Sequence, residues 1–200
     1  MSYSFGVETI RNLKKQQIDV NLDFAYQGMK DAMAGNKFLM DDDELKENYA
    51  MFQSMVRANM IQGRMNIGQN NQKKGEIFLA ENKTKEGVVT LPSGLQYKIL
   101  KEGTGPKPKD TDTIQCYYRG TLIDGTEFDS SAHSNNEGFP ATVNLASCIQ
   151  GWREALALMP VGSKWQLFIP SGLAYGPRPS GRYIGPNATL IFEVELVAIK

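Results

Sequence analysis

The stretch that decides the fold is ATLIFEVELVAI, which occupies residues 188–199. Apolar and polar residues alternate along it, and this two-residue period is typical of a strand with one buried face. The residues on the expected buried face are Leu190, Phe192, Val194 and Leu196. The stretch therefore predicts a long final strand that lays one side against a core.

Shorter strand patterns precede this stretch. They cover residues 95–100, 113–118, 126–129, 141–145 and 164–170. Asp124-Gly125 is a pair typical of tight hairpins. One short helix is expected at residues 151–158, where Pro160 ends it. Together these elements predict an α+β domain, in which a curved antiparallel sheet wraps on a short α-helix and leaves an aromatic-rich crevice.

Proline and methionine divide the chain into two parts. All 9 prolines lie at or after Pro92, whereas 8 of the 9 methionines lie at or before Met65. Because proline breaks helices more strongly than any other residue, a long segment without it can be helical throughout. Apolar spacing then predicts one helix at residues 4–15, a second from a cap at residues 19–21 to a stop at Gly35-Asn36, and a third from about residue 41 to about residue 83.

These helices predict an assembly region followed by an arm. A helix of roughly 40 residues is about 60 Å long. We expect an all-α dimerisation region at residues 1–40, a long connecting helix at residues 41–84 and a separate domain at residues 85–200. A homodimer formed by residues 1–60 would cover their apolar faces, and methionine fills irregular gaps at such contacts. The alternative is that these helices pack on the back half of the same chain.

Three local features of the long helix need an interpretation. The four acids at residues 41–44 lack the spacing of a calcium loop, so we interpret them as a helix start, where acids favour the dipole. Between Arg64 and Lys74 the helix is polar on all sides, so this part either crosses solvent or is unstable on its own. Gly63, Gly68 and Gly75 are expected weak points, each costing about 1 kcal/mol relative to alanine.

Composition excludes several classes of function. The chain has 22 basic and 22 acidic residues, and neither half is basic, so the field of a nucleic-acid binder is missing. One histidine and two cysteines cannot supply the four ligands of a structural zinc site. The histidine, His133, lies in a polar run and is expected in a solvated loop. No run of 18 apolar residues predicts a membrane span.

Four segments in a fixed order point to a known family. They are residues 115–120 (QCYYRG), 125–131 (GTEFDSS), 149–152 (IQGW), and 173–176 (LAYG) with 184–192 (IGPNATLIF). This set resembles the FKBP-type peptidyl-prolyl cis-trans isomerases over residues 94–200. Phe5-Gly6, residues 28–33 (GMKDAM) and residues 91–97 (LPSGLQY) resemble the macrophage infectivity potentiator group, in which an N-terminal helical domain dimerises.

The resemblance implies a proline-binding site. Trp152 would form its floor, and the catalytic set would be Tyr118, Phe128, Asp129, Ile149, Trp152, Tyr175 and Phe192. Cys148, Ile184 and Ala141 would contact substrate around it. The Ile149 N–H and the Tyr175 hydroxyl would hydrogen-bond substrate carbonyls, and Asp129 would orient Tyr118.

The implied activity is cis/trans rotation of X-Pro bonds in peptides and unfolded proteins, without a metal or a cofactor. The implied partners are these proline-containing chains, a second copy of this chain and macrolide inhibitors of the rapamycin class. Two other functions stay open: a non-enzymatic holdase that clamps unfolded clients, and a macrolide-binding or protein-docking module with little turnover.

The compartment stays open as well. Relatives of the potentiator type are mostly exported, which favours the bacterial periplasm or cell envelope if a signal has been removed. Cys116 and Cys148 read either as free thiols or as one disulfide, and free thiols favour the cytoplasm.

Overall fold

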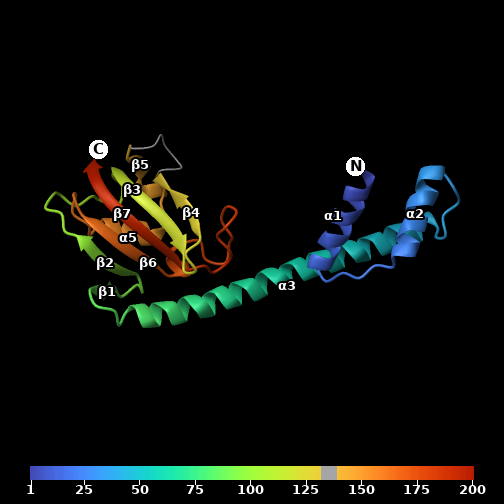
Figure 1. The fold of residues 1–200 in the computed structure, drawn as a ribbon, viewed down its shortest axis with the longest axis horizontal. Helices are drawn as coiled ribbons and strands as arrows, with labels where there is room; N and C mark the ends of the chain where they lie inside the picture. The colour runs from blue at the N-terminus through green and yellow to red at the C-terminus, as the bar shows by residue number, and fades with distance from the viewer. Residues whose placement is uncertain (132–138) are drawn as a thin grey trace. The chain divides into compact units, whose positions relative to one another are not determined.

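A computed structural model describes residues 1–131 and 139–200 of the chain (Figure 1). The chain divides into two compact units, residues 1–65 and residues 66–200. His133, which we expected in a solvated loop, lies outside the described residues. No helix in the described part is both long enough and apolar enough to cross a membrane.

The front half forms three helices, and capping residues stand at both ends of the second. The helices are α1 (Ser2–Lys15), α2 (Leu22–Ala34) and α3 (Asp42–Asn82). The Asn21 side chain accepts the backbone N–H groups of Asp23 and Phe24 at the start of α2. Gly35 ends α2 in the left-handed conformation, with φ of 66°. The predicted cap and stop of this helix are confirmed.

The acids at the start of α3 form its cap. The Asp41 carboxylate accepts the N–H groups of Asp43 and Glu44, while the Glu44 carboxylate accepts the N–H of Asp41. This reciprocal arrangement is a capping box, which satisfies donors that the first turn leaves unpaired. The interpretation of residues 41–44 as a helix start is therefore confirmed.

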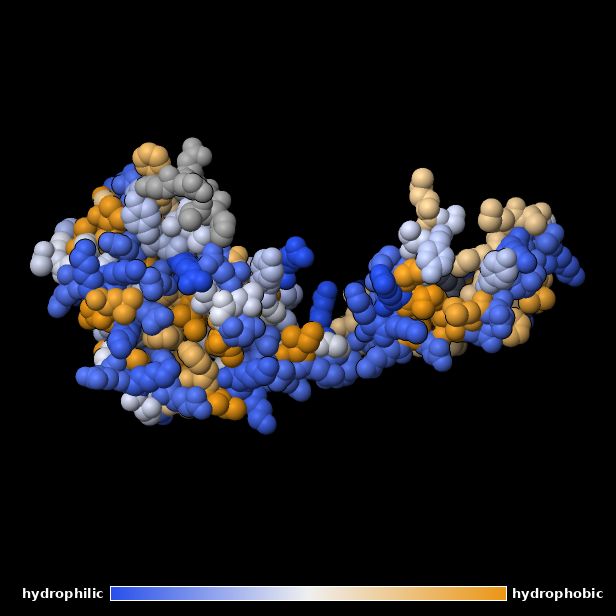
Figure 2. All heavy atoms as spheres, viewed as in Figure 1, coloured by the Kyte–Doolittle hydropathy of each residue, from blue (hydrophilic) through white to orange (hydrophobic). Residues whose placement is uncertain are grey.

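The unit of residues 1–65 buries little of its apolar surface. Ile18 is the one buried hydrophobic residue among these 65, all of which the structure describes. Both α1 and α2 leave aromatic side chains exposed, and α2 also leaves two methionines exposed, of which Met33 is 91% exposed. Figure 2 shows apolar side chains gathered on the surface of this helical unit.

The second unit is built on one antiparallel sheet of seven strands. The strands are β1 (Val88–Thr90), β2 (Gln96–Lys101), β3 (Thr113–Leu122), β4 (Glu127–Ser130), β5 (Ala141–Asn144), β6 (Lys164–Ile169) and β7 (Leu190–Ile199). Their order is β1-β2-β6-β7-β3-β4, and β5 pairs with the first part of β3. The sequence predicted all of them except β1, a three-residue strand in a polar junction.

The core lies between the sheet and the short helix α5 (Gln150–Leu156). Leu190, Phe192, Val194 and Leu196 are all buried, which confirms the predicted face of the final strand. From α5, Trp152, Ala155 and Leu156 join the same core. The predicted fold, a curved antiparallel sheet wrapped on one helix, is confirmed.

The C-terminal half of α3 belongs to this second unit. The Asn82 amide donates to the Gln96 side-chain oxygen at 3.0 Å, and the Gln96 amide donates to the Leu79 carbonyl at 2.9 Å. Gly68 and Gly75 are buried. Of the two alternatives for residues 64–74, the solvent-crossing one is therefore wrong for one face of the helix. Contacts there are made by glycine and amide groups that hydrophobic patterning does not detect.

Candidate active site

Four aromatic rings meet edge to face on the core side of the sheet. The Trp152 ring lies 5.4 Å from the Tyr118 ring and 5.2 Å from the Phe192 ring, with interplanar angles of 85° and 82°. Phe128 stands edge-on to Phe192 at 5.4 Å. Aromatic rings favour this geometry because the positive edge of one faces the negative face of another. The cluster is thus a set of rings held in fixed orientation.

Each ring comes from a different element. Tyr118 lies on β3, Phe128 on β4, Trp152 on α5 and Phe192 on β7. The register pairs Gly120 of β3 with Phe192 of β7. Trp152 is 5% exposed, and its indole N–H has no acceptor among the described residues, so ring contacts and burial fix its position.

Gly120 makes room for two of the rings. A Cβ at this position would lie 2.6 Å from the Phe128 ring and 2.8 Å from the Phe192 ring. A side chain there would displace both, so Gly120 is a residue of the site that the sequence analysis missed. Its signal was available, since a glycine inside a strand indicates a close approach.

A hydrogen bond fixes the Tyr118 ring at its outer end. The Tyr118 hydroxyl donates to the Asp129 carboxylate at 3.0 Å. The Tyr118 backbone N–H also donates to the Ser131 hydroxyl at 3.1 Å, and that hydroxyl donates to the Tyr118 carbonyl at 3.3 Å. Ser131 was not among the predicted residues, because a serine after a strand carries no specific signal.

Three further predicted residues belong to the core that holds the rings or pack against it. Ile184 is buried in the core that also contains Trp152 and Phe192. The half-buried side chains of Cys148 and Ile149 pack against that core. Ile149 caps α5, and its N–H has no acceptor in residues 1–131 or 139–200. Burial raises the pKa of the Cys148 thiol, whereas nearby Arg153 lowers it. Cys116 and Cys148 are both free thiols.

Two predicted residues are not brought into the ring cluster. Ala141 is buried on β5, where it pairs with Cys116 of β3. Tyr175 follows a short 3-10 turn (Ser171–Leu173) and is 41% exposed, with no ring contact among the described residues. Both stay candidates for substrate contact and not parts of the preformed cluster.

The chemistry that this site can support follows from its groups. It offers apolar ring faces, one carboxylate and one backbone donor. No group of three or more His, Cys, Asp or Glu side chains in the described part could hold a metal ion.

Comparisons with known proteins agree along the whole chain. The family model described as FKBP-type peptidyl-prolyl cis-trans isomerase matches residues 105–197, and the model of the domain amino terminal to FKBP-type peptidyl-prolyl isomerase matches residues 1–99. The outer membrane protein MIP of Legionella longbeachae is 46% identical over 200 residues, which cover 100% of this chain and 84% of that protein. The FKBP-type 22 kDa peptidyl-prolyl cis-trans isomerase of Escherichia coli is 40% identical, covering 99% and 93%.

A solved structure shows the same fold. The crystal structure of FkpA from Escherichia coli matches with a TM-score of 0.83 at 34% identity, covering 100% of this chain and 92% of that one. The chain therefore belongs to the FKBP-type peptidyl-prolyl cis-trans isomerases. Within that family it is similar to the Mip and FkpA proteins.

Proposed function

We propose that this chain rotates X-Pro bonds of peptides and unfolded proteins without forming a covalent bond to them, and that Trp152 is the floor on which the proline ring lies. The observation that carries the proposal is the edge-on placement of Tyr118 and Phe192 against the Trp152 ring. This arrangement offers a flat ring a rigid apolar seat. Its walls are Tyr118, Phe128, Ile149 and Phe192. Ile184 forms a further wall from the loop before β7, and Cys148 and Ala141 contact the residues around the proline.

The physical basis is the loss of amide resonance in the transition state. Rotation of a peptide bond faces a barrier of roughly 18–20 kcal/mol, and X-Pro bonds take tens to hundreds of seconds to rotate uncatalysed. The twisted amide is less polar than the planar one, so an apolar site binds it more tightly than the ground state. Each 1.36 kcal/mol of that difference raises the rate tenfold.

Hydrogen bonds hold the rest of the peptide while the bond turns. The unpaired Ile149 N–H and the exposed Tyr175 hydroxyl donate to substrate carbonyls. Asp129 acts through Tyr118, whose ring it orients, and takes no proton from the substrate. No general base is required, which suits a site formed mainly by aromatic rings.

A kinetic comparison of two aromatic substitutions tests the site. Phe128→Ala removes a wall and should lower kcat/KM for an Ala-Pro peptide at least tenfold, which corresponds to about 1.4 kcal/mol of transition-state stabilisation. Tyr117→Ala is the matched control. Tyr117 precedes Tyr118 on β3, and neighbouring residues of a strand point to opposite faces, so the Tyr117 side chain points away from the ring cluster. A macrolide of the rapamycin class should inhibit the intact chain. An inactive intact chain would contradict the proposal.

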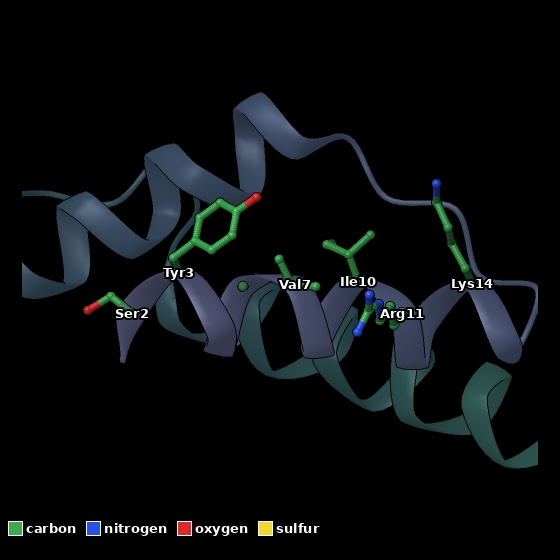
Figure 3. A pocket seen from close by; sticks show the side chains of 7 residues that line it. Ser2, Tyr3, Val7, Ile10, Arg11 and Lys14 are labelled. Carbon is green, nitrogen blue, oxygen red and sulfur yellow. The ribbon is translucent and has the colours of Figure 1, made fainter.

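We further propose that a second copy of this chain covers the helical unit, and that the regions 1–40, 41–84 and 85–200 are the dimerisation region, the connecting helix and the isomerase domain. The support is the low burial of residues 1–65 in the single chain. Tyr3, Val7 and Ile10 lie along one side of α1, where they line an open hollow (Figure 3). Contiguous exposed apolar faces mark interaction surfaces in folded proteins.

Sedimentation of the full chain tests the dimer. Val7→Glu places a charge on the open face of α1 and should shift the chain from dimer to monomer at micromolar concentration. Asn12→Glu adds the same charge on another side of α1 and should leave the dimer intact. A wild-type chain that sediments as a monomer would refute this proposal and leave the catalytic one standing.

The exposed methionines favour a second candidate function. Met29, Met33, Met51 and Met55 are each about half exposed or more. Their flexible, polarizable side chains suit the binding of varied unfolded clients. If the chain is a holdase, Phe128→Ala should suppress client aggregation as well as the wild type does, although it has lost isomerase activity. Loss of both activities together would count against a separate holdase function.

A further inference from the structure

Helix α3 touches the loop that carries one wall of the candidate site. The loop runs from Gly176 to Asn187 and is closed at its base by the Asn187 N–H, which donates to the Gly176 carbonyl at 2.7 Å. Within it, Ile184 bridges to Ser180 through two backbone hydrogen bonds of 2.9 and 3.3 Å. Ile184 is 8% exposed and belongs to the core that holds Trp152 and Phe192.

Two asparagines fasten this loop to the helix. The Asn71 amide of α3 donates to the Pro186 carbonyl at 2.9 Å, two residues after Ile184. In the reverse direction, the Asn187 amide donates to the Gly68 carbonyl of α3 at 3.4 Å. Asn187 has φ of 54°, a left-handed conformation that asparagine tolerates better than most residues.

Glycines on both sides set the separation of helix and loop. A Cβ on Gly68 would lie 3.2 Å from the Asn187 amide nitrogen, and a Cβ on Gly185 would lie 3.0 Å from the Asn71 amide nitrogen. A side chain at either position would press on the asparagine amide that forms the hydrogen bond and would displace it. The close approach therefore depends on small residues at both positions, and the asparagine pair holds it there.

The fastening is confined to the base of the loop. Beside it, a hollow of about 420 Å³ is lined by residues of α3, by Tyr183 and by the turn after β3. Tyr183 is half exposed. The two asparagine hydrogen bonds between helix and loop fall at Pro186 and Asn187, and the Asn71 bond is the one nearer to Ile184 along the chain.

We infer that Asn71 of α3 is a positioning residue for the isomerase: through the Pro186 carbonyl it holds Ile184 at the wall of the proline site. The inference rests on the proposed function, because it assigns a role in that same site. It gives the long helix a part in substrate binding in addition to its part in linking the regions of the chain.

Kinetics of full-length variants test the role. Asn71→Ala removes the donor, and Asn71→Asp keeps the shape but cannot donate to a carbonyl. Each should raise KM for an X-Pro peptide about three- to tenfold, the range that one neutral hydrogen bond contributes, with kcat within twofold of wild type. Gln72→Ala is the matched control, because the Gln72 amide bonds Glu76 on the same helix. It should leave both constants unchanged.

Hydrogen exchange supplies a readout that does not depend on activity. The backbone N–H of Asn187, which donates to the Gly176 carbonyl, should exchange about three- to tenfold faster in both Asn71 variants. In Gln72→Ala it should exchange at the wild-type rate. Asn187→Gly keeps the left-handed conformation and removes the bond to Gly68, so it serves as a second variant if an Asn71 variant does not fold. It should also raise KM.

The outcomes separate the two proposals. Raised KM together with faster exchange supports the positioning role. Wild-type KM in the Asn71 variants, with or without faster exchange, overturns it and leaves the proposed function standing. An intact chain that does not isomerise any X-Pro peptide overturns the proposed function, and the positioning role with it.

Discussion

The Tyr118 hydroxyl donates a 3.0 Å hydrogen bond to Asp129, which joins the central ring cluster to the strand that carries Phe128. Asp129 is exposed, so water screens part of this interaction. The bond nevertheless fixes the ring that stands edge-on to Trp152. Orientation of the site thus depends on a contact between β3 and β4 that any shift of either strand would break.

Loss of this bond should affect catalysis more than folding. Tyr118→Phe keeps the ring and removes the donor, and we expect the free energy of unfolding to fall by about 1 kcal/mol or less. We expect kcat/KM to fall about three- to tenfold, because the ring loses its fixed orientation. Chemical denaturation and peptide kinetics on one preparation measure both. Asp129→Asn, which keeps an acceptor, should lose less activity than Asp129→Leu.

The two tryptophans provide a spectroscopic test of which ring meets the substrate. Trp165 is buried on β6 and stacks on Tyr97 at 4.4 Å, whereas Trp152 lies in the ring cluster. In Trp165→Phe, where Trp152 is the remaining tryptophan, a proline peptide should change the fluorescence in a saturable manner. In Trp152→Phe the peptide should leave the fluorescence unchanged. The reverse pattern would place the binding site elsewhere.

Gly120→Ala should disable the site through crowding. The new methyl group would lie 2.6 Å from the Phe128 ring, and overpacking of this kind costs about 1–3 kcal/mol of stability. Both rings must move, so we also expect a loss of kcat/KM of about tenfold or more. Gly172→Ala is the control, because no heavy atom lies within 4 Å of the position of its Cβ. Equal activity of the two variants would contradict the assignment of Gly120.

Two glycines of α3 should respond to alanine in opposite directions. A Cβ on Gly75 would collide with the Thr189 side chain, so Gly75→Ala should destabilise the chain by about 1–3 kcal/mol. Gly63 has no heavy atom near its Cβ position, so Gly63→Ala should stabilise the helix by about 1 kcal/mol. Thermal unfolding of both variants measures the difference. A stabilising Gly75→Ala would show that the helix and the sheet do not pack as described.

Cys116 sets an alkaline limit on stability. Burial, together with the nearby Cys148 thiol, raises its pKa from 9.0 to about 12. Because the folded pKa is the higher one, the unfolded chain loses this proton first, and stability present below about pH 9 is lost as the pH rises toward 12. One such group lowers the free energy of unfolding by about 1.4 kcal/mol per pH unit in that window. In denaturant unfolding between pH 8 and pH 11, the free energy of unfolding should therefore fall less steeply with pH for Cys116→Ala than for the wild type. The cavity that this substitution leaves lowers stability equally at every pH, so it does not change the slope. Parallel slopes would contradict this assignment.

Much of this molecule could be predicted because its patterns are local. The alternation along residues 188–199 and the caps at Asn21 and Gly35 depend on neighbouring residues alone, and the structure has them where the sequence placed them. The strand at residues 88–90 could not be predicted. It has three residues and depends on its pairing with β2.

The parts that sequence reasoning missed depend on contacts between distant segments. Gly68 and Gly75 read as weak points of an exposed arm, yet they are buried against Pro186 and Thr189, more than 100 positions away. In the sequence, Asn71 is one residue of a polar stretch. Its hydrogen bond to a carbonyl far along the chain leaves no periodic pattern that could have been recognised. Glycine and asparagine on a helix can mark a docking face as well as a solvent face, and hydrophobicity alone does not separate the two.

The most direct test of the account is a set of intermolecular nuclear Overhauser effects between an Ala-Pro peptide and the full chain. The account predicts cross-peaks from the proline ring protons to the Trp152 indole and to the Phe128 and Phe192 rings. It also predicts that these cross-peaks disappear in Phe128→Ala and persist in Tyr117→Ala. Cross-peaks to another part of the chain, with isomerase activity intact, would contradict it.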